Sequence, residues 1–269
     1  MTVSTRSVAP VLEAARAEGR AALIGYLPTG YPDVATSVEA MVAMVEGGCD
    51  VIEVGVAYSD PVIDGPVIQR AAEVAVANGT TLTDTLTAVR AVADAGGAAL
   101  VMSYWNVIDR YGVQRFADDL AAAGGSGAIT PDLIPDEAAE WMSAAESNGL
   151  DRVFLVAPSS TDARVVSTAA ASRGFVYAAS AMGVTGTRAA IGNAAGDLVA
   201  RCRRLAPDTH FCVGLGVSDA DQAAEVAGYA DGVIVGSAFV RRLLDDPGPG
   251  GIAAVRDLAA ELAEGVRRR

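Results

Sequence analysis

Short apolar runs alternate with longer segments in which apolar residues recur at helical spacing, from one end of the chain to the other. The runs are almost continuously apolar, as is typical of parallel strands that are covered on both faces. Residues 33–48, for example, place apolar side chains on one side of a helix that would end at Gly47 and Gly48. Eight strands are predicted, at residues 21–27, 50–56, 98–104, 127–130, 152–157, 174–179, 210–216 and 231–237.

Strands that alternate with helices form right-handed β–α–β units and a parallel sheet. Eight such units favour a closed barrel over an open, doubly wound sheet. The length of 269 residues agrees, because a (β/α)8 barrel occupies about 250 residues as one domain. The best candidate for a linker, 245–251, is followed by too few residues for a second domain. We therefore predict an α/β fold: a single (β/α)8 TIM barrel spanning 1–269, with an extra N-terminal helix and a loose tail at 1–8.

Two of the predicted connections are unusually long, at residues 55–67 and 179–193. Loops of this length in a compact barrel are usually functional lids. Both follow the carboxyl ends of strands, the face on which barrel active sites form. We expect the active site between them.

The charge composition excludes several classes of function. The net charge is −13, and no cluster of basic residues provides the positive surface that nucleic-acid binding needs. All 20 basic residues are arginine, so the chain can form neither a Schiff-base aldolase site nor a lysine-bound pyridoxal phosphate site. His210 is the one histidine, which argues against a histidine-clustered metal centre. We expect no metal and no cofactor on this chain, and acid–base chemistry from Asp, Glu, Tyr or Cys.

The sequence also indicates where the protein works. No apolar run reaches the roughly 18 residues of a membrane span, and the first residues lack the pattern of a signal peptide. The three cysteines have no metal or redox spacing, and their odd number argues against a disulfide scaffold. We expect a cytoplasmic protein that does not bind membranes.

Glycines at the ends of three late strands predict a phosphate site. Gly216 would allow a close backbone approach, and Gly236 and Ser237 would open a short helix whose N–H groups and dipole favour an anion. Gly186, in the loop after the sixth strand, would add a further donor. Each glycine alone could simply serve a turn, but loops after the seventh and eighth strands often bind phosphate in barrels.

Two acidic residues are candidates for catalysis. Glu53 lies inside an apolar strand, where loss of water should raise its pKa into the range of a useful acid or base. Asp64, in the loop beyond, is expected to be more solvated and ionised, so the two carboxyl groups could divide the acid and base roles. Other interpretations stay open: Glu53 could pair with an arginine, Asp64-Gly65 is a common turn dipeptide, and Tyr177 could pack in the core.

The segment GVAYSDPVIDGPVIQ (55–69) resembles the signature of the tryptophan synthase alpha subunit family, in the style of its actinobacterial members. Ala57 departs from it, because the family usually has proline there, which leaves the stiffness of the loop open. Further matching segments occur in family order at 26–32, 103–112, 130–137, 154–160, 177–186, 213–218 and 231–240.

The resemblance implies a barrel enzyme, a carbon–carbon lyase, that cleaves indole-3-glycerol phosphate to indole and glyceraldehyde 3-phosphate. It implies Glu53 as general acid–base and Asp64 as the partner of the indole N–H. The remaining residues that it places around the substrate and its phosphate are Tyr177, Thr185, Gly186, Gly216, Gly236, Ser237, Tyr26, Met102 and Ile129.

The resemblance also implies an α2β2 heterotetramer for tryptophan biosynthesis. The beta subunit would carry pyridoxal phosphate and receive indole by substrate channelling. Ala57, Asp60 and Asn106 match positions at the contact between the subunits. Three alternatives remain: a stand-alone lyase that releases indole, a weakly catalytic subunit that mainly activates its partner, and another phosphate-binding barrel such as a sugar-phosphate epimerase.

Overall fold

The computed structural model describes residues 7–61, 63–179, 188–214 and 216–268. Within them, nine parallel strands form one sheet with the order β5-β4-β3-β2-β1-β9-β8-β7-β6. The strands are β1 (Ala22–Pro28), β2 (Val51–Gly55), β3 (Ala98–Met102), β4 (Gly127–Ile129), β5 (Asp151–Val153), β6 (Leu155–Val156), β7 (Val176–Ala179), β8 (Phe211–Gly214) and β9 (Gly232–Val235).

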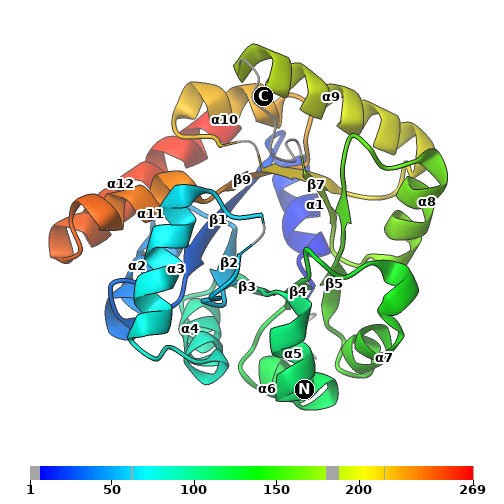
Figure 1. Ribbon diagram of the computed structural model, residues 1–269. Helices are drawn as coiled ribbons and strands as arrows, with labels where there is room; N and C mark the ends of the chain where they lie inside the picture. The colour runs from blue at the N-terminus through cyan, green and yellow to red at the C-terminus, as the bar shows by residue number, and fades with distance from the viewer. Residues whose placement is uncertain (1–6, 62, 180–187, 215, 269) are drawn as a thin grey trace.

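The sheet closes on itself, because the two strands at the ends of this order are consecutive pieces of chain. β5 pairs with β4, and β6 pairs with β7. Phe154 lies between them, and its carbonyl oxygen accepts a hydrogen bond from the backbone N–H of Tyr177 (3.0 Å). The predicted eight-stranded barrel is thus confirmed, with its fifth strand divided in two at Phe154 (Figure 1).

Helices surround the sheet (Figure 1). They are α1 (Ala9–Ala17), α2 (Val34–Glu46), α3 (Pro66–Ala77), α4 (Leu82–Asp94), α5 (Trp105–Tyr111), α6 (Val113–Ala122), α7 (Ala139–Ser147), α8 (Asp162–Ala171), α9 (Arg188–Leu205), α10 (Ala220–Ala227), α11 (Ser237–Asp245) and α12 (Pro249–Val266), with a 3-10 turn η1 (Pro135–Glu137). The predicted loop at 179–193 is too long at its end, because α9 begins at Arg188.

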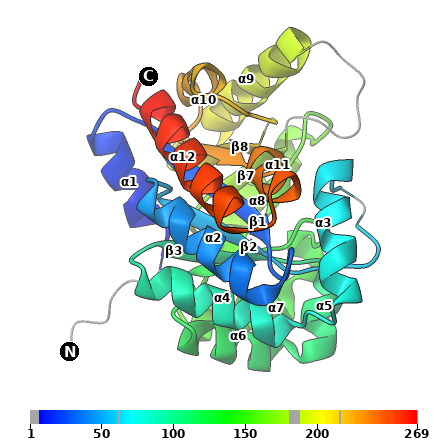
Figure 2. The same cartoon turned by 90° about the vertical axis from the view of Figure 1, so that its left-hand side faces the viewer.

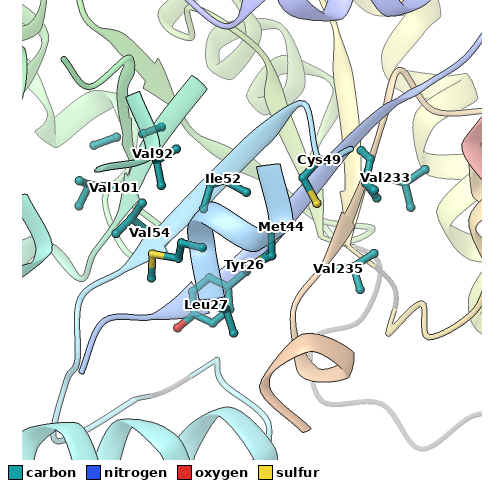
Figure 3. Close-up of a cluster of buried hydrophobic side chains, with 14 of the residues drawn as sticks. Tyr26, Leu27, Met44, Cys49, Ile52, Val54, Val92, Val101, Val233 and Val235 are labelled. Atoms are coloured by element: carbon teal, nitrogen blue, oxygen red, sulfur yellow. The ribbon is translucent and has the colours of Figure 1, made fainter. Parts of the chain in front are cut away.

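Two hydrophobic cores follow from the alternation of side chains along the strands. The outer core fills the space between the sheet and the helices, and Figure 3 shows part of it, including Val54, Met44 and Val101. The inner core fills the barrel and includes Ile24, Leu100, Phe175 and Cys212. Apart from Tyr26, which also packs with the outer core beside Leu27, residues one position apart on a strand belong to different cores, and this alternation turns Glu53 into the barrel.

Helix α1 supplies the predicted extra N-terminal helix and belongs to the inner core. Leu12 and Ala15 are buried there together with Val8, whose N–H donates to the Asp151 carboxylate (2.6 Å). Figure 2 shows α1 at one side of the molecule, with α3 toward the other side. The predicted tail at 1–8 is too long at its end, since Val8 is fully buried; residues 1–6 lie outside the described part.

None of the helices in the described part of the chain is long and apolar enough to span a membrane.

A carboxylate joins β1 to β2 at the start of both strands. Asp50 accepts hydrogen bonds from the Leu23 N–H (2.8 Å) and from both terminal nitrogens of Arg20 (2.7 and 2.9 Å). The side chains of Arg20 and Asp50 are only 12% and 16% exposed. Hydrogen bonds to charged groups out of water are the stronger kind, so this contact should contribute substantially to stability.

We expect Asp50→Ala to lower the free energy of unfolding by about 3 kcal/mol, because it leaves a largely buried guanidinium and a backbone N–H without their acceptor. Urea denaturation measures the change. Glu18→Ala is the matched control, since Glu18 contacts the same arginine (2.7 Å) from an exposed position and should have a much smaller effect. Equal effects of the two substitutions would contradict this account.

Candidate active site

A cavity of about 230 Å³ opens at the carboxyl ends of the strands, the face expected for a barrel active site. Tyr26 and Glu53 are opposite each other in the register of β1 and β2, so both point into the barrel. The cavity is lined by Tyr26, Glu53, Ile63, Asp64, Gly65, Ile68, Met102, Tyr177, Gly214, Gly216, Ile234, Gly236 and Ser237.

Glu53 is a buried carboxyl group whose electrostatic environment is unusual. Its side chain is 1% exposed, and its Oε1 atom has no hydrogen-bond partner among the described residues. No ion pair joins it to an arginine in that part of the chain, which disfavours the alternative of a structural salt bridge. Burial raises the pKa of Glu53 to about 8. The predicted shift is confirmed in direction and cause, and it leaves a protonated acid at neutral pH.

Asp64 lines the same cavity from the loop between β2 and α3. It is more exposed than Glu53, as expected, but it is still half-buried, and burial raises its pKa as well. Gly65 has a φ of −75° and precedes the first residue of α3, so it does not use the left-handed region that glycine favours in turns. The alternative in which Asp64-Gly65 serves only as a turn is therefore disfavoured, because this conformation does not require glycine.

Two tyrosines complete the walls beside the carboxyl groups. Burial and the carboxylates of Asp64 and Glu53 raise the pKa of both Tyr26 and Tyr177. Both rings fit because a neighbouring position lacks a side chain: a Cβ on Gly55 would lie 2.6 Å from the Tyr26 hydroxyl, and one on Gly214 would collide with that of Tyr177. Tyr177 therefore lines the cavity, whereas the sequence left open whether it would pack in the core instead.

The predicted phosphate residues converge at one side of the cavity. Gly216 adopts a left-handed φ of +60°, and Gly236 and Ser237 form the start of α11. Within the described residues, no side chain caps this N-terminus, so its first N–H groups remain available to a ligand. Thr185 and Gly186 lie outside the described residues.

The described residues that line the cavity differ from those predicted from the sequence: one predicted residue is absent from the lining, and several lining residues were not predicted. Ile129 is predicted around the substrate, but it is fully buried in the inner core and does not line the cavity of the described structure, whereas Met102 does. Gly214 and Ile234 were missed, although each lies two residues before a predicted glycine on an inward-facing position. Ile63 and Ile68 were missed too, and no signal in the sequence indicates on which side of the loop and of α3 they lie.

The predicted partner-contact residues lie close to the site. Asn106 donates to the Tyr58 hydroxyl (3.0 Å), next in the chain to Ala57, while Asp60 is exposed and accepts from Ser59 (2.6 Å). In the described ranges, no three His, Cys, Asp or Glu side chains are grouped so that they could hold a metal ion.

Comparison with known proteins decides the family. The family model described as tryptophan synthase alpha chain matches residues 12–264. The chain belongs to the tryptophan synthase alpha chain family. It is 63% identical to the alpha chain of Thermobifida fusca, over 99% of this chain and 98% of that protein, and 62% identical to that of Mycobacterium avium, over 97% and 94%. The family is a lyase family, and the resemblance identified from the sequence is confirmed.

Solved structures agree in fold. A Mycobacterium tuberculosis tryptophan synthase structure is 59% identical with a TM-score of 0.91, covering 97% of this chain and 98% of that one. The alpha subunit from Legionella pneumophila is 28% identical, yet still has a TM-score of 0.88 over 98% and 99% of the two chains. The barrel is therefore retained in relatives that differ at most positions.

The buried Glu53 should make stability depend on pH in a specific way. A carboxyl group with a raised folded pKa contributes stability that is fully present below its unfolded pKa, near 4.5, and is lost as pH rises through about 8. Relative to Glu53→Gln, we expect the wild-type free energy of unfolding to fall by on the order of 4 kcal/mol between pH 4.5 and pH 9.

Urea unfolding of both proteins at pH 5, 7 and 9 measures this difference. Glu73→Gln, on the exposed side of α3, is the matched control and should not reproduce the trend. A wild-type protein that gains stability over Glu53→Gln toward pH 9 would show that Glu53 ionises in a favourable environment.

Proposed function

We propose that the chain cleaves indole-3-glycerol phosphate to indole and glyceraldehyde 3-phosphate by a retro-aldol reaction. The observation that carries the proposal is an unpaired, buried Glu53 in a cavity that it shares with Asp64 and the open N-terminus of α11. The reaction needs one group that both donates and accepts a proton, an anion near the indole nitrogen, and an anion site for the phosphate.

Glu53 serves as the general acid in the first step. At neutral pH a pKa of about 8 keeps most of it protonated, so it can donate its proton to C3 of the indole ring. Protonation at C3 places positive charge on the indole nitrogen. The Asp64 carboxylate accepts a hydrogen bond from this N–H and stabilises the charge, an interaction strengthened by the half-buried position of Asp64.

The carbon–carbon bond breaks in the second step. The Glu53 carboxylate accepts the proton of the glycerol hydroxyl as that oxygen becomes the aldehyde carbonyl. The bonding electrons return to the indole ring and neutralise its nitrogen. Glu53 ends protonated as it began, so protons balance over the cycle without a cofactor on this chain.

The remaining lining residues bind and orient the substrate. Gly216, Gly236 and Ser237 hold the phosphate through backbone N–H groups and the dipole of α11, with Gly186 as a further donor. Tyr26 and Met102 line the cavity where the indole ring would bind, and Tyr177 supports Glu53 from β7. The family resemblance adds Thr185 to the residues around the indole.

We propose further that the chain works in the cytoplasm as the alpha part of an α2β2 heterotetramer. Its beta partner binds pyridoxal phosphate and consumes the indole, which passes to it by channelling. This division fits a chain that has no lysine for a Schiff base. The segment at Ala57–Asp60 and Asn106 would contact the partner.

Indole release from indole-3-glycerol phosphate, measured with and without a cognate beta chain, tests the function. We expect slow release by the chain alone and a sharp increase when the partner is added. Fast release without the partner would favour a stand-alone lyase instead. A chain that releases no indole under either condition would contradict the proposal.

We expect Glu53→Gln to lower kcat by about 10³-fold, because the amide can neither donate nor accept the transferred proton. Beta-chain binding should be retained, since Glu53 is buried inside the barrel and its side chain does not reach the surface. Indole release and a binding titration measure the two properties separately. A fully active Glu53→Gln variant would exclude Glu53 as the acid–base group.

A further inference from the structure

The backbone around Asp64 is held by side chains from both directions. The hydroxyl of Tyr104 accepts a hydrogen bond from the N–H of Ile63, the residue before Asp64 (3.1 Å). The amide of Gln69, in the first turns of α3, donates to the carbonyl oxygen of Asp64 itself (2.9 Å). Two side chains that are distant from each other in the sequence thus hold the backbone one residue before Asp64 and the peptide group that follows it.

Tyr104 is well placed to act as a fixed anchor. It is 8% exposed and follows β3 as the residue before α5. Its ring stacks on that of Tyr58, with 4.7 Å between the centroids and 29° between the planes. The Tyr58 hydroxyl in turn accepts from Asn106 of α5 (3.0 Å). The anchor therefore joins the loop after β2 to the end of β3 and to α5.

The described residues between the start of the loop and Asp64 are half-buried or exposed. The beginning of the loop is held where the Val56 N–H donates to the Met102 carbonyl (2.9 Å), but Ser59 and Asp60 beyond it are exposed. Asp64 nevertheless turns into the cavity, and Tyr104 lines a small neighbouring space together with Asp64, Tyr26 and Met102. A catalytic group on a loop needs such supports, because a displacement of about 1 Å costs on the order of 100-fold in rate.

We propose that Tyr104 and Gln69 are positioning residues that hold the Asp64 carboxylate at the indole nitrogen. This inference rests on the proposed function. Tyr104 holds the backbone N–H of Ile63, one residue before Asp64, and Gln69 holds the peptide group that follows Asp64. Loss of either hydrogen bond lets the carboxylate move away from the developing charge, while Glu53 and the phosphate site keep their geometry.

Tyr104→Phe tests the first contact, because it keeps the stacked ring and removes the hydroxyl that accepts from Ile63. Gln69→Met tests the second, because it keeps the length of the side chain and removes the donor. We expect each to lower kcat about 10-fold and to change KM less than twofold, since the phosphate contacts are separate. Tyr111→Phe and Gln114→Met are the matched controls: their polar groups bond Asp119 and Asp118 away from the cavity, and kcat should not change.

Combination with Asp64→Asn separates positioning from a general effect on the fold. Asp64→Asn alone should lower kcat about 100-fold, which single-turnover assays at high enzyme concentration still measure. If Tyr104 and Gln69 act through Asp64, adding Tyr104→Phe or Gln69→Met to Asp64→Asn lowers kcat by less than twofold more. The assays use the chain together with its beta partner.

Each outcome bears on a different claim. Unchanged kcat in both single variants, or full 10-fold losses that persist in the Asp64→Asn background, overturns the positioning role and leaves the proposed function intact. Large changes in KM with unchanged kcat also overturn it. A wild-type chain that releases no indole with its partner overturns the proposed function, and the positioning role with it.

Discussion

The barrel holds a carboxyl group almost entirely out of contact with water, and the chemistry of the cavity follows from that constraint. Glu53 faces inward because strand residues alternate between the two cores, and its Oε1 has no partner in the described residues. A buried acid of this kind keeps its proton at neutral pH. Pairing Glu53 with an arginine would lower its pKa and remove the proton that the proposed reaction uses. The apolar β2 strand around Glu53 is therefore part of the chemistry as well as part of the core.

Glycines leave the room that the aromatic rings beside this carboxyl group occupy. The Tyr26 ring occupies room left by Gly55, with Gly236 on its other side, where a Cβ would come within 3.2 Å of the ring. Tyr177 depends on Gly214 in the same way. The tyrosines form walls of the cavity beside the carboxyl groups, and the glycines leave room for their rings. Glycines in these strands thus have a packing role that differs from the turn role of Gly216.

Alternation and periodicity were sufficient to predict the eight strand positions, the inward direction of Glu53 and the meeting of Asp64 with the late glycines. They were insufficient wherever packing between distant segments decides. The break at Phe154 arises because β5 and β6 pair with different neighbours, which a local pattern does not contain. The burial of Asp64 depends on how its loop folds over the cavity. Ile68 lines the site only because α3 begins directly after that loop.

Buried acidic residues lie at both ends of the barrel, but within the described residues they have arginine partners at one end and none at the other. At the starts of the strands, Asp50, Asp151 and Asp231 each accept a backbone N–H and face an arginine. Removing one member of such a buried pair is costly, because the other charge is left without its partner. At Asp151, burial still outweighs these contacts and raises the pKa of the carboxyl group. At the other end, Glu53 has no such compensation and destabilises the protein once it ionises. The carboxyl groups at the starts of the strands thus have arginine partners, whereas the one near their ends is, among the described residues, left unpaired for the proposed chemistry, so the two roles lie at opposite ends of the parallel barrel.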